Sequence, residues 1–205
     1  MIKTILFDMG SVLVRFEPKE FIAKLGIEGP DALAIERELF RSADWVRLDR
    51  GTFTQRQAIE AVCARLPERL HAAVEQLTLH WDAERPEVPG MFELVKELSE
   101  AGYELCLLTY ASLRHHEYWP TFRFAPYFGG RIMLSAEWKL LKPDRAFYEK
   151  AVELLGFDPA ESVFIDDQPT NIEAAELFGI PGIVFYDDVP LLRKRLRDMG
   201  VTVSE

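Results

Sequence analysis

Short apolar runs and amphipathic helical segments alternate along most of the chain. The short runs predict five buried strands, at 2–7, 103–108, 131–134, 162–165 and 182–185. Helical spacing of apolar residues predicts four helices between or after them, at 90–101, 144–155, 170–178 and 188–199. Strands that alternate with helices join through right-handed crossovers, and helices then cover both faces of a parallel sheet. The pattern therefore predicts an α/β fold with a doubly wound parallel sheet.

Two regions interrupt this alternation. Residues 18–85 look helical throughout, and Thr54 with Gln57 forms a capping-box pattern before apolar positions at helical spacing. Residues 111–130 are rich in aromatic side chains and in loop-forming residues. We expect no strand in the first region and mainly loop in the second.

The helical region interrupts the chain after its first strand, which predicts an insertion into the α/β core. We expect the core to comprise residues 1–16 and 87–205, and the helical domain to comprise residues 17–86. Two passages, near 16–18 and 85–89, would connect the two bodies and could act as a hinge.

Composition narrows the class of protein. The 205 residues are 48% hydrophobic, which is ordinary for a globular protein, and the net charge is −10. An acidic chain is a poor partner for nucleic acid, and no apolar stretch is long enough to cross a membrane. Two cysteines, Cys63 and Cys106, do not make a disulfide framework, and the first residues do not form a signal peptide. We therefore expect a reduced, cytoplasmic protein that attracts any anionic ligand only locally.

Reactive side chains stand where predicted strands end. Asp8, Thr109 and the pair Asp166 and Asp167 each follow an apolar run, and Lys142 directly precedes a predicted helix. Such residues are also common as helix caps, so one alone is not informative. Because parallel strands present their carboxyl ends at one edge, however, we expect this set to meet there and to form a ligand site.

The carboxylates of this set would repel one another. At about 4 Å a pair of like charges costs about 4 kcal/mol at an effective dielectric constant near 20. A divalent cation relieves this repulsion, and an open cluster of carboxylate oxygens suits Mg²⁺. A carboxylate-bound Mg²⁺ beside Lys142 would make a phosphate site.

Four segments of the chain carry a family resemblance: FDMGSVL at 7–13, LLT at 107–109, LKPD at 141–144 and VFIDDQPTN at 163–171. In this order they resemble the four motifs of the haloacid dehalogenase-like (HAD) superfamily. The helical insertion is similar in position to the helical cap of the first cap class, subfamily I. The resemblance implies a Rossmann-like HAD core with a helical cap inserted after the first strand.

The resemblance also implies a role for each motif residue. Asp8 would be the nucleophile and would carry the phosphoryl group as an aspartyl-phosphate. Thr109 would hydrogen-bond a phosphoryl oxygen, and Lys142 would bridge Asp8 and the phosphate. Asp167 would ligate Mg²⁺ together with Asp8, and Asp166 would lie at or just behind the metal's ligands.

Two positions depart from the usual family pattern. The residue two after the nucleophile is usually an aspartate that acts as general acid and base, whereas this chain has Gly10. Gly10 can still ligate the metal through its carbonyl, but loss of an acid–base group typically costs about 10²–10⁴-fold in rate. Similar bacterial sugar-1-phosphate phosphatases also have glycine here. Tyr110 replaces the more usual asparagine, and either its hydroxyl contacts phosphate or its ring packs.

Arginines of the insertion are candidates for contact with substrate. Arg47 and Arg50 lie near Gly51 in a loop-like stretch, and arginine suits a phosphate or a sugar hydroxyl. A solvated surface position is the alternative reading for both. The expected partner is a small phosphorylated metabolite, such as a sugar phosphate, bound by a monomer or a homodimer.

The sequence thus predicts a Mg²⁺-dependent phosphomonoesterase. A 2-haloacid dehalogenase also lacks the second aspartate, but it needs no Mg²⁺ and hence no Asp166–Asp167 pair. A non-catalytic protein that binds phosphate esters is the alternative of a different class, and Gly10 and Tyr110 are the reasons for considering it.

Overall fold

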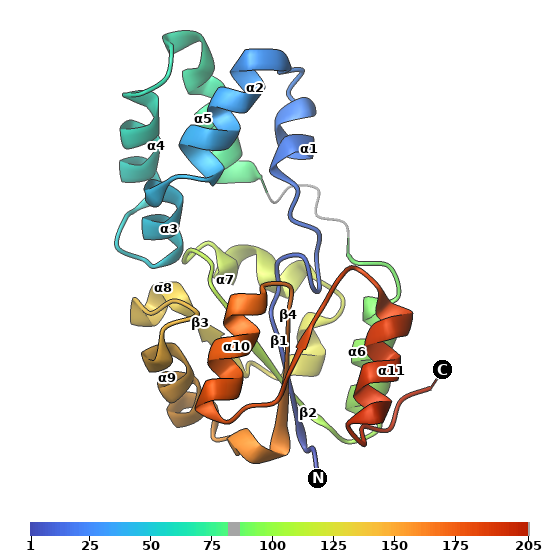
Figure 1. Cartoon of the computed structure of the whole chain (residues 1–205). Helices are drawn as coiled ribbons and strands as arrows, with labels where there is room; N and C mark the ends of the chain where they lie inside the picture. Colours follow the sequence, from blue (N-terminus) through green and yellow to red (C-terminus); the bar gives the residue numbers. More distant parts are fainter. Residues whose placement is uncertain (82–86, 205) are drawn as a thin grey trace.

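A five-stranded parallel sheet forms the centre of the molecule (Figure 1). The computed structural model of the chain describes residues 1–81 and 87–204. The strands are β1 (Thr4–Phe7), β2 (Glu104–Thr109), β3 (Ile132–Leu134), β4 (Ser162–Asp166) and β5 (Gly182–Val184). Their order in the sheet is β3-β2-β1-β4-β5, and every neighbouring pair is parallel. The predicted doubly wound sheet is confirmed.

Helices cover both faces of the sheet. The four covering helices are α6 (Met91–Glu100), α9 (Arg145–Leu155), α10 (Pro169–Phe178) and α11 (Val189–Asp198). Ile5 and Phe7 of β1 pack in one hydrophobic cluster with α6 and α11, whereas Leu6 packs in another with α9 and α10. Because alternate residues of a strand point to opposite faces, one fully buried strand serves both layers.

A second group of helices lies beyond the carboxyl ends of the strands (Figure 1). We call these the cap helices: α1 (Pro18–Ala23), α2 (Gly29–Ile35), α3 (Ala43–Asp49), α4 (Gln55–Cys63) and α5 (His71–His80). They bury a hydrophobic cluster of their own, and no described residue between 17 and 81 lies in a strand. The capping box of Thr54 and Gln57 begins α4 as predicted.

The ends of the helical insertion stay a prediction. Residues 82–86 lie outside the described part of the chain. They include residues 85 and 86 of the second expected passage, 85–89. In the first passage, Gly10 and Val14 form a β-bridge before the chain enters α1, and Val14 also bridges to Glu87. The two passages therefore run beside each other where the described chain leaves and re-enters the core.

The aromatic region is more ordered than expected. Residues 111–130 contain α7 (His115–Tyr118) and two 3₁₀ turns, and α8 (Ser135–Trp138) follows β3. Short helical turns thus replace part of the expected loop, and they are fixed where the buried Trp119 contacts the buried Phe124 and Phe128. No helix in the described ranges is long and apolar enough to cross a membrane.

Candidate active site

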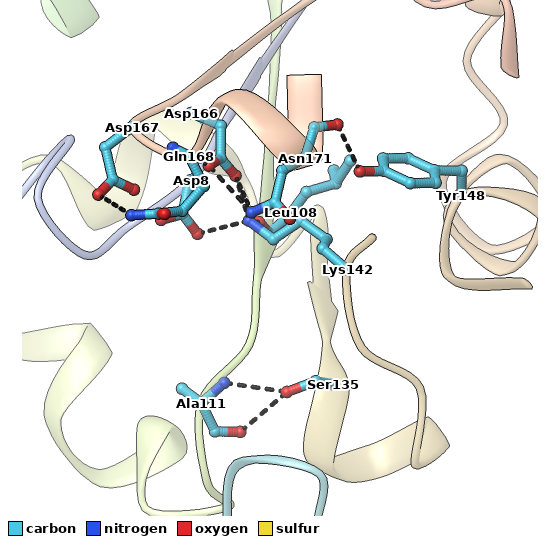
Figure 2. A network of polar contacts seen from close by, with 10 residues as sticks. All are labelled: Asp8, Leu108, Ala111, Ser135, Lys142, Tyr148, Asp166, Asp167, Gln168 and Asn171. Carbon is cyan, nitrogen blue, oxygen red and sulfur yellow. Dashed lines mark hydrogen bonds and ion pairs between the residues drawn. The ribbon is translucent and has the colours of Figure 1, made fainter. Parts of the chain in front are cut away.

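A buried lysine joins the ends of the central strands. Lys142 Nζ donates to Asp8 Oδ1 at 2.8 Å, to Asp166 Oδ2 at 2.6 Å and to the Leu108 carbonyl oxygen at 2.9 Å (Figure 2). Asp8 follows β1, Leu108 belongs to β2 and Asp166 ends β4, so three adjacent strands meet at one ammonium group. All three donors of the lysine are used, which fixes its position.

Burial and charge oppose each other in this cluster. Burial lowers the pKa of Lys142, but the carboxylates of Asp166 and Asp8 outweigh burial and raise this pKa above its ordinary value. Burial raises the pKa of Asp8 to about 7, although the positive charge of Lys142 acts in the opposite direction. Lys142 is therefore charged at neutral pH, and one lysine does not fully compensate its acidic neighbours.

The acidic residues form a group that could hold a metal ion. One carboxylate oxygen from each of Asp8, Asp166 and Asp167 lies within 4.8 Å of the others. Burial, followed by the charge of Asp166, raises the pKa of Asp167. Three carboxylates against one lysine leave an excess of negative charge, and a hard, oxygen-binding cation such as Mg²⁺ fits it.

Asp166 lies deeper than the other two carboxylates. It is fully buried, accepts hydrogen bonds from the Gln168 backbone N–H and from Asn171 Nδ2, and contacts Lys142. Tyr148 in turn donates to the Asn171 carbonyl oxygen at 2.7 Å (Figure 2). The structure thus gives Asp166 a supporting position, whereas Asp8 and Asp167 face the pocket above.

A pocket of about 520 Å³ lies between the strand ends and the cap helices. Six of the residues singled out in the sequence line it: Asp8, Gly10, Thr109, Tyr110, Lys142 and Asp167. The segments that carry these residues are far apart in the chain, so the pocket exists only in the folded protein. Its size is ordinary for a small-molecule site.

Arg47 and Arg50, the two arginines predicted to contact substrate, do not line this pocket. Among the described lining residues are Val46, Leu48 and Asp49 from α3, but neither Arg47 nor Arg50. Arg47 Nη1 instead donates to Asp44 Oδ1 at 2.7 Å, within the cap helices. The periodicity of α3 turns its apolar side chains, rather than these two arginines, toward the site.

The two departures from the family pattern both lie at the pocket. The Tyr110 ring has its centroid 5.1 Å from Lys142 Nζ, at a distance typical of a cation–π contact. Burial raises the pKa of Tyr110 to about 12, so its hydroxyl stays protonated at neutral pH. At Gly10 an added Cβ would meet only Phe16 Cβ, at 3.9 Å. Space therefore does not require glycine at this position.

Sequence reasoning missed the residues that join the cap helices to the core. Ser135 Oγ donates to the Asp49 carbonyl oxygen at 2.7 Å and accepts from the Ala111 backbone N–H at 2.9 Å. Figure 2 shows this Ala111–Ser135 contact below the carboxylate cluster and apart from it. Gly51 packs its backbone on that of Ala136. No motif marks these residues, because their partners are set only by tertiary contact.

Asp49 is also a pocket residue that the sequence did not single out. Burial raises its pKa well above the usual value, although hydrogen bonds from the Ser112 backbone and the Trp45 side chain oppose this shift. Asp49 is the last residue of α3. Its carbonyl oxygen accepts from Ser135 Oγ and its carboxyl accepts from the Ser112 backbone, so both groups face the core. A carboxyl group of the cap helices therefore lies against the pocket.

Comparison with protein families decides the class. The model of the haloacid dehalogenase-like hydrolases matches residues 2–179. The chain belongs to this hydrolase family. The HAD fold, the order of the four motifs and the site at the strand ends are consistent with this assignment.

Of two curated relatives of this HAD hydrolase, one is named as a flavin mononucleotide hydrolase and the other as a phosphatase. Flavin mononucleotide hydrolase 1 of Arabidopsis thaliana, named as a chloroplast protein, is 31% identical over 115 residues. That match covers 56% of this chain and 46% of the relative, so it spans less than half of the plant protein. A sesquiterpene phosphatase of Aspergillus oryzae is 26% identical over 196 residues, or 91% of each chain.

Solved structures share the fold over nearly the whole chain. A HAD-like family hydrolase of Porphyromonas gingivalis has a TM-score of 0.73 at 19% identity, covering 96% of this chain and 98% of its own. A HAD family enzyme of Bacteroides thetaiotaomicron, crystallised with magnesium and inorganic phosphate, has a TM-score of 0.69 at 21% identity. That match covers 94% of this chain and 99% of the neighbour. At these identities the likeness establishes the fold.

Proposed function

We propose that the chain is a Mg²⁺-dependent phosphomonoesterase that acts on a small phosphorylated metabolite. The observation that carries the proposal is the contact of Lys142 with both Asp8 and Asp166 beneath an open pocket, with Asp167 beside them. A buried cation and an excess of carboxylates at one end of a cavity provide for a bound metal ion and a phosphate group together. Curated relatives named as a flavin mononucleotide hydrolase and a sesquiterpene phosphatase support the same reaction.

In this proposal Asp8 attacks the phosphorus atom of the ester. The bond from phosphorus to the alcohol oxygen breaks, and Asp8 holds the phosphoryl group as an aspartyl-phosphate until water hydrolyses it. Lys142 positions the Asp8 carboxylate and offsets negative charge on the phosphoryl oxygens. Thr109, which is 1% exposed at the end of β2 and lines the pocket, would donate its hydroxyl to one of these oxygens.

Asp8, Asp167 and the Gly10 carbonyl oxygen would hold Mg²⁺, with Asp166 supporting them from behind. When bound, the ion supplies positive charge that favours ionised Asp8 and shields the phosphate from it. Gly10 supplies no acid–base group, so the leaving alcohol must take its proton from another donor or from water.

The test is hydrolysis of p-nitrophenyl phosphate with and without Mg²⁺. We expect activity only with Mg²⁺, and a loss of about 10³-fold or more in Asp8→Asn, which removes the nucleophile. Asp198→Asn, on the exposed side of α11, is the matched control and should keep full activity. Full activity of Asp8→Asn would show that the nucleophile is another group.

The alternatives predict other outcomes in the same assays. Chloride release from 2-chloropropionate in the presence of EDTA would identify a dehalogenase that uses Asp8 as its nucleophile. Binding of phosphate esters without turnover over a broad substrate panel would identify a binding protein. A cytoplasmic location and a monomeric or homodimeric state remain proposals, which cell fractionation and sedimentation would test.

A further inference from the structure

The pocket has two chemically different ends. The end formed by the core carries charged and polar side chains. The opposite side carries the acidic Asp49 and six apolar residues, which we call the cap wall: Phe16, Phe40, Trp45, Val46, Leu48 and Trp81. Phosphate chemistry occupies the first end, so the cap wall faces the rest of the substrate.

The rings of the cap wall hold one another in place. The Phe16 centroid lies 4.9 Å from that of Trp81 and 6.0 Å from that of Phe40. Phe40 and Trp45 are 4.7 Å apart, and each is 8% exposed. Edge-to-face and tilted contacts at these distances are favourable, so the wall is formed before any ligand binds.

Val46 extends the wall to the solvent. Its side chain is apolar, lines the pocket and is 47% exposed, although it stands on a helix whose other pocket-lining side chains are largely buried. A single exposed valine needs no explanation, but one that continues a buried aromatic surface enlarges an apolar binding face.

The cap wall offers no positive charge in the described part of the chain. Arg47 lies over the Phe53 ring at 5.2 Å and pairs with Asp44, away from the pocket. The charged residue that α3 does present to the cavity is Asp49, which is acidic. A second phosphate or a carboxylate on the substrate would therefore meet no counter-charge beside this wall.

Hydroxyl groups would find few partners along the wall, because Asp49 is the one carboxyl group that the described cap helices present to the pocket and it already accepts from the Trp45 side chain. Burying a hydroxyl without a hydrogen bond is unfavourable, whereas burying hydrocarbon against aromatic rings is favourable. A sugar carries several hydroxyls that would have to leave water on the apolar side of the pocket. A hydrocarbon body of similar size loses nothing by the same transfer.

From this arrangement we propose that the substrates are monophosphate esters of uncharged, apolar alcohols, with the hydrocarbon body bound against the cap wall. The inference rests on the proposed phosphatase function and names its substrate class. It differs from the sugar phosphate that the family resemblance suggests. The cavity of about 520 Å³ has room for a hydrocarbon body of one or more rings beside the phosphate.

A matched pair of esters tests this specificity. Cyclohexylmethyl phosphate and glucose 6-phosphate are both esters of primary alcohols on a six-membered ring, and they differ in ring oxygen and hydroxyls. We expect kcat/KM with Mg²⁺ to be at least tenfold higher for cyclohexylmethyl phosphate. Equal or better turnover of glucose 6-phosphate would overturn the inference and leave the phosphatase proposal intact.

A pair of variants locates the preference on the wall. Val46→Asn should raise KM for cyclohexylmethyl phosphate about fivefold to tenfold and leave kcat/KM for glucose 6-phosphate within twofold. Leu33→Asn changes a 64% exposed leucine of α2 that does not line the pocket, and it should change neither constant. Equal effects of the two variants would exclude the wall as the origin of specificity.

A binding experiment separates the two proposals. Cyclohexylmethanol has no phosphate, and its binding to the wall should change the fluorescence of Trp45 and Trp81 in a saturable way. Val46→Asn should weaken this binding severalfold. Saturable binding without turnover of either ester would support the wall and contradict the phosphatase, whereas turnover with no response to the alcohol would contradict the wall.

Discussion

The carboxylate end of the pocket and the cap wall are built on opposite principles. At the carboxylate end, Lys142 Nζ makes three directed contacts at distances of 2.6 to 2.9 Å, two of them to carboxylates. Along the cap wall, ring centroids lie 4.7 to 6.4 Å apart, and these apolar contacts provide a shaped surface with little directional preference. Electrostatic contacts fix one geometry, whereas apolar contacts tolerate many ligands of suitable size.

This difference separates the residues proposed to act on phosphate from those proposed to select the substrate. The strand ends hold the groups that we propose act on phosphate, and the adjacent strands β1, β2 and β4 position Asp8, Thr109 and Asp167. Three residues of the cap wall belong to the short helix α3, and Phe40 ends the π-helical turn before it. Phe16 and Trp81 lie just before α1 and just after α5. We therefore expect substitutions at the first end to change kcat strongly and substitutions at the second to act on KM.

The largest effect is expected for Lys142→Met. This change removes the cation between Asp8 and Asp166 and leaves two buried carboxylates without their positive counter-charge. We expect kcat/KM for p-nitrophenyl phosphate to fall by about 10³-fold or more. The free energy of unfolding should fall by about 3 kcal/mol, the usual cost of breaking a buried ion pair. Urea denaturation and steady-state kinetics measure the two effects.

Lys96→Met is the control for this prediction. Lys96 pairs with Glu100 on the exposed side of α6 at 3.7 Å, and such surface pairs contribute less than about 1 kcal/mol. It should leave activity unchanged. If Lys142→Met kept its activity while losing stability, the lysine would be a structural counter-ion alone, and the comparison between the two ends would fail.

Gly10→Asp should act in the opposite direction. An added Cβ at this position meets only Phe16 Cβ, at 3.9 Å, so the aspartate side chain can be accommodated at the pocket. An acid–base group there should raise kcat for esters of poor leaving groups about 10- to 10²-fold. For p-nitrophenyl phosphate, whose leaving group needs no proton, the gain should be small. Gly10→Asn adds a similar volume without the acid, and an equal gain from it would rule out proton transfer as the cause.

The strand ends could be predicted from the sequence because topology alone brings them together. Asp8 and Asp166 follow apolar runs, and parallel strands that share one sheet must present such residues at one edge. Lys142 is also predicted from the sequence, because it directly precedes a predicted helix. Asn171 was overlooked, although it stands five residues after Asp166, because its hydrogen bond to that carboxylate is formed across a turn.

The cap wall could not be predicted in the same way. Apolar residues at helical spacing show that a helix buries one face, but they do not show against what. Arg47 and Arg50 are predicted to contact substrate because arginine suits phosphate. Pairing with Asp44, however, holds the Arg47 side chain away from the pocket. Which face of α3 meets the pocket depends on packing with the rest of the cap helices and on its contact with Ser135.

The smallest effect on catalysis is expected where the cap helices rest on the core, at Gly51. This glycine has φ +73°, and an added Cβ would lie 2.2 Å from the Ala136 carbonyl oxygen, so Gly51→Ala must displace the loop after α3 from α8. Gly26→Ala is the matched control, because Gly26 has φ +70° and an added Cβ meets nothing within 4 Å. In both variants the alanine must adopt a left-handed backbone conformation, which should lower the free energy of unfolding by about 1 kcal/mol. Only Gly51→Ala should also raise KM for cyclohexylmethyl phosphate, by about threefold, with kcat for p-nitrophenyl phosphate nearly unchanged. Equal KM values for the two variants would mean that the seating of α3 on the core does not position the cap wall.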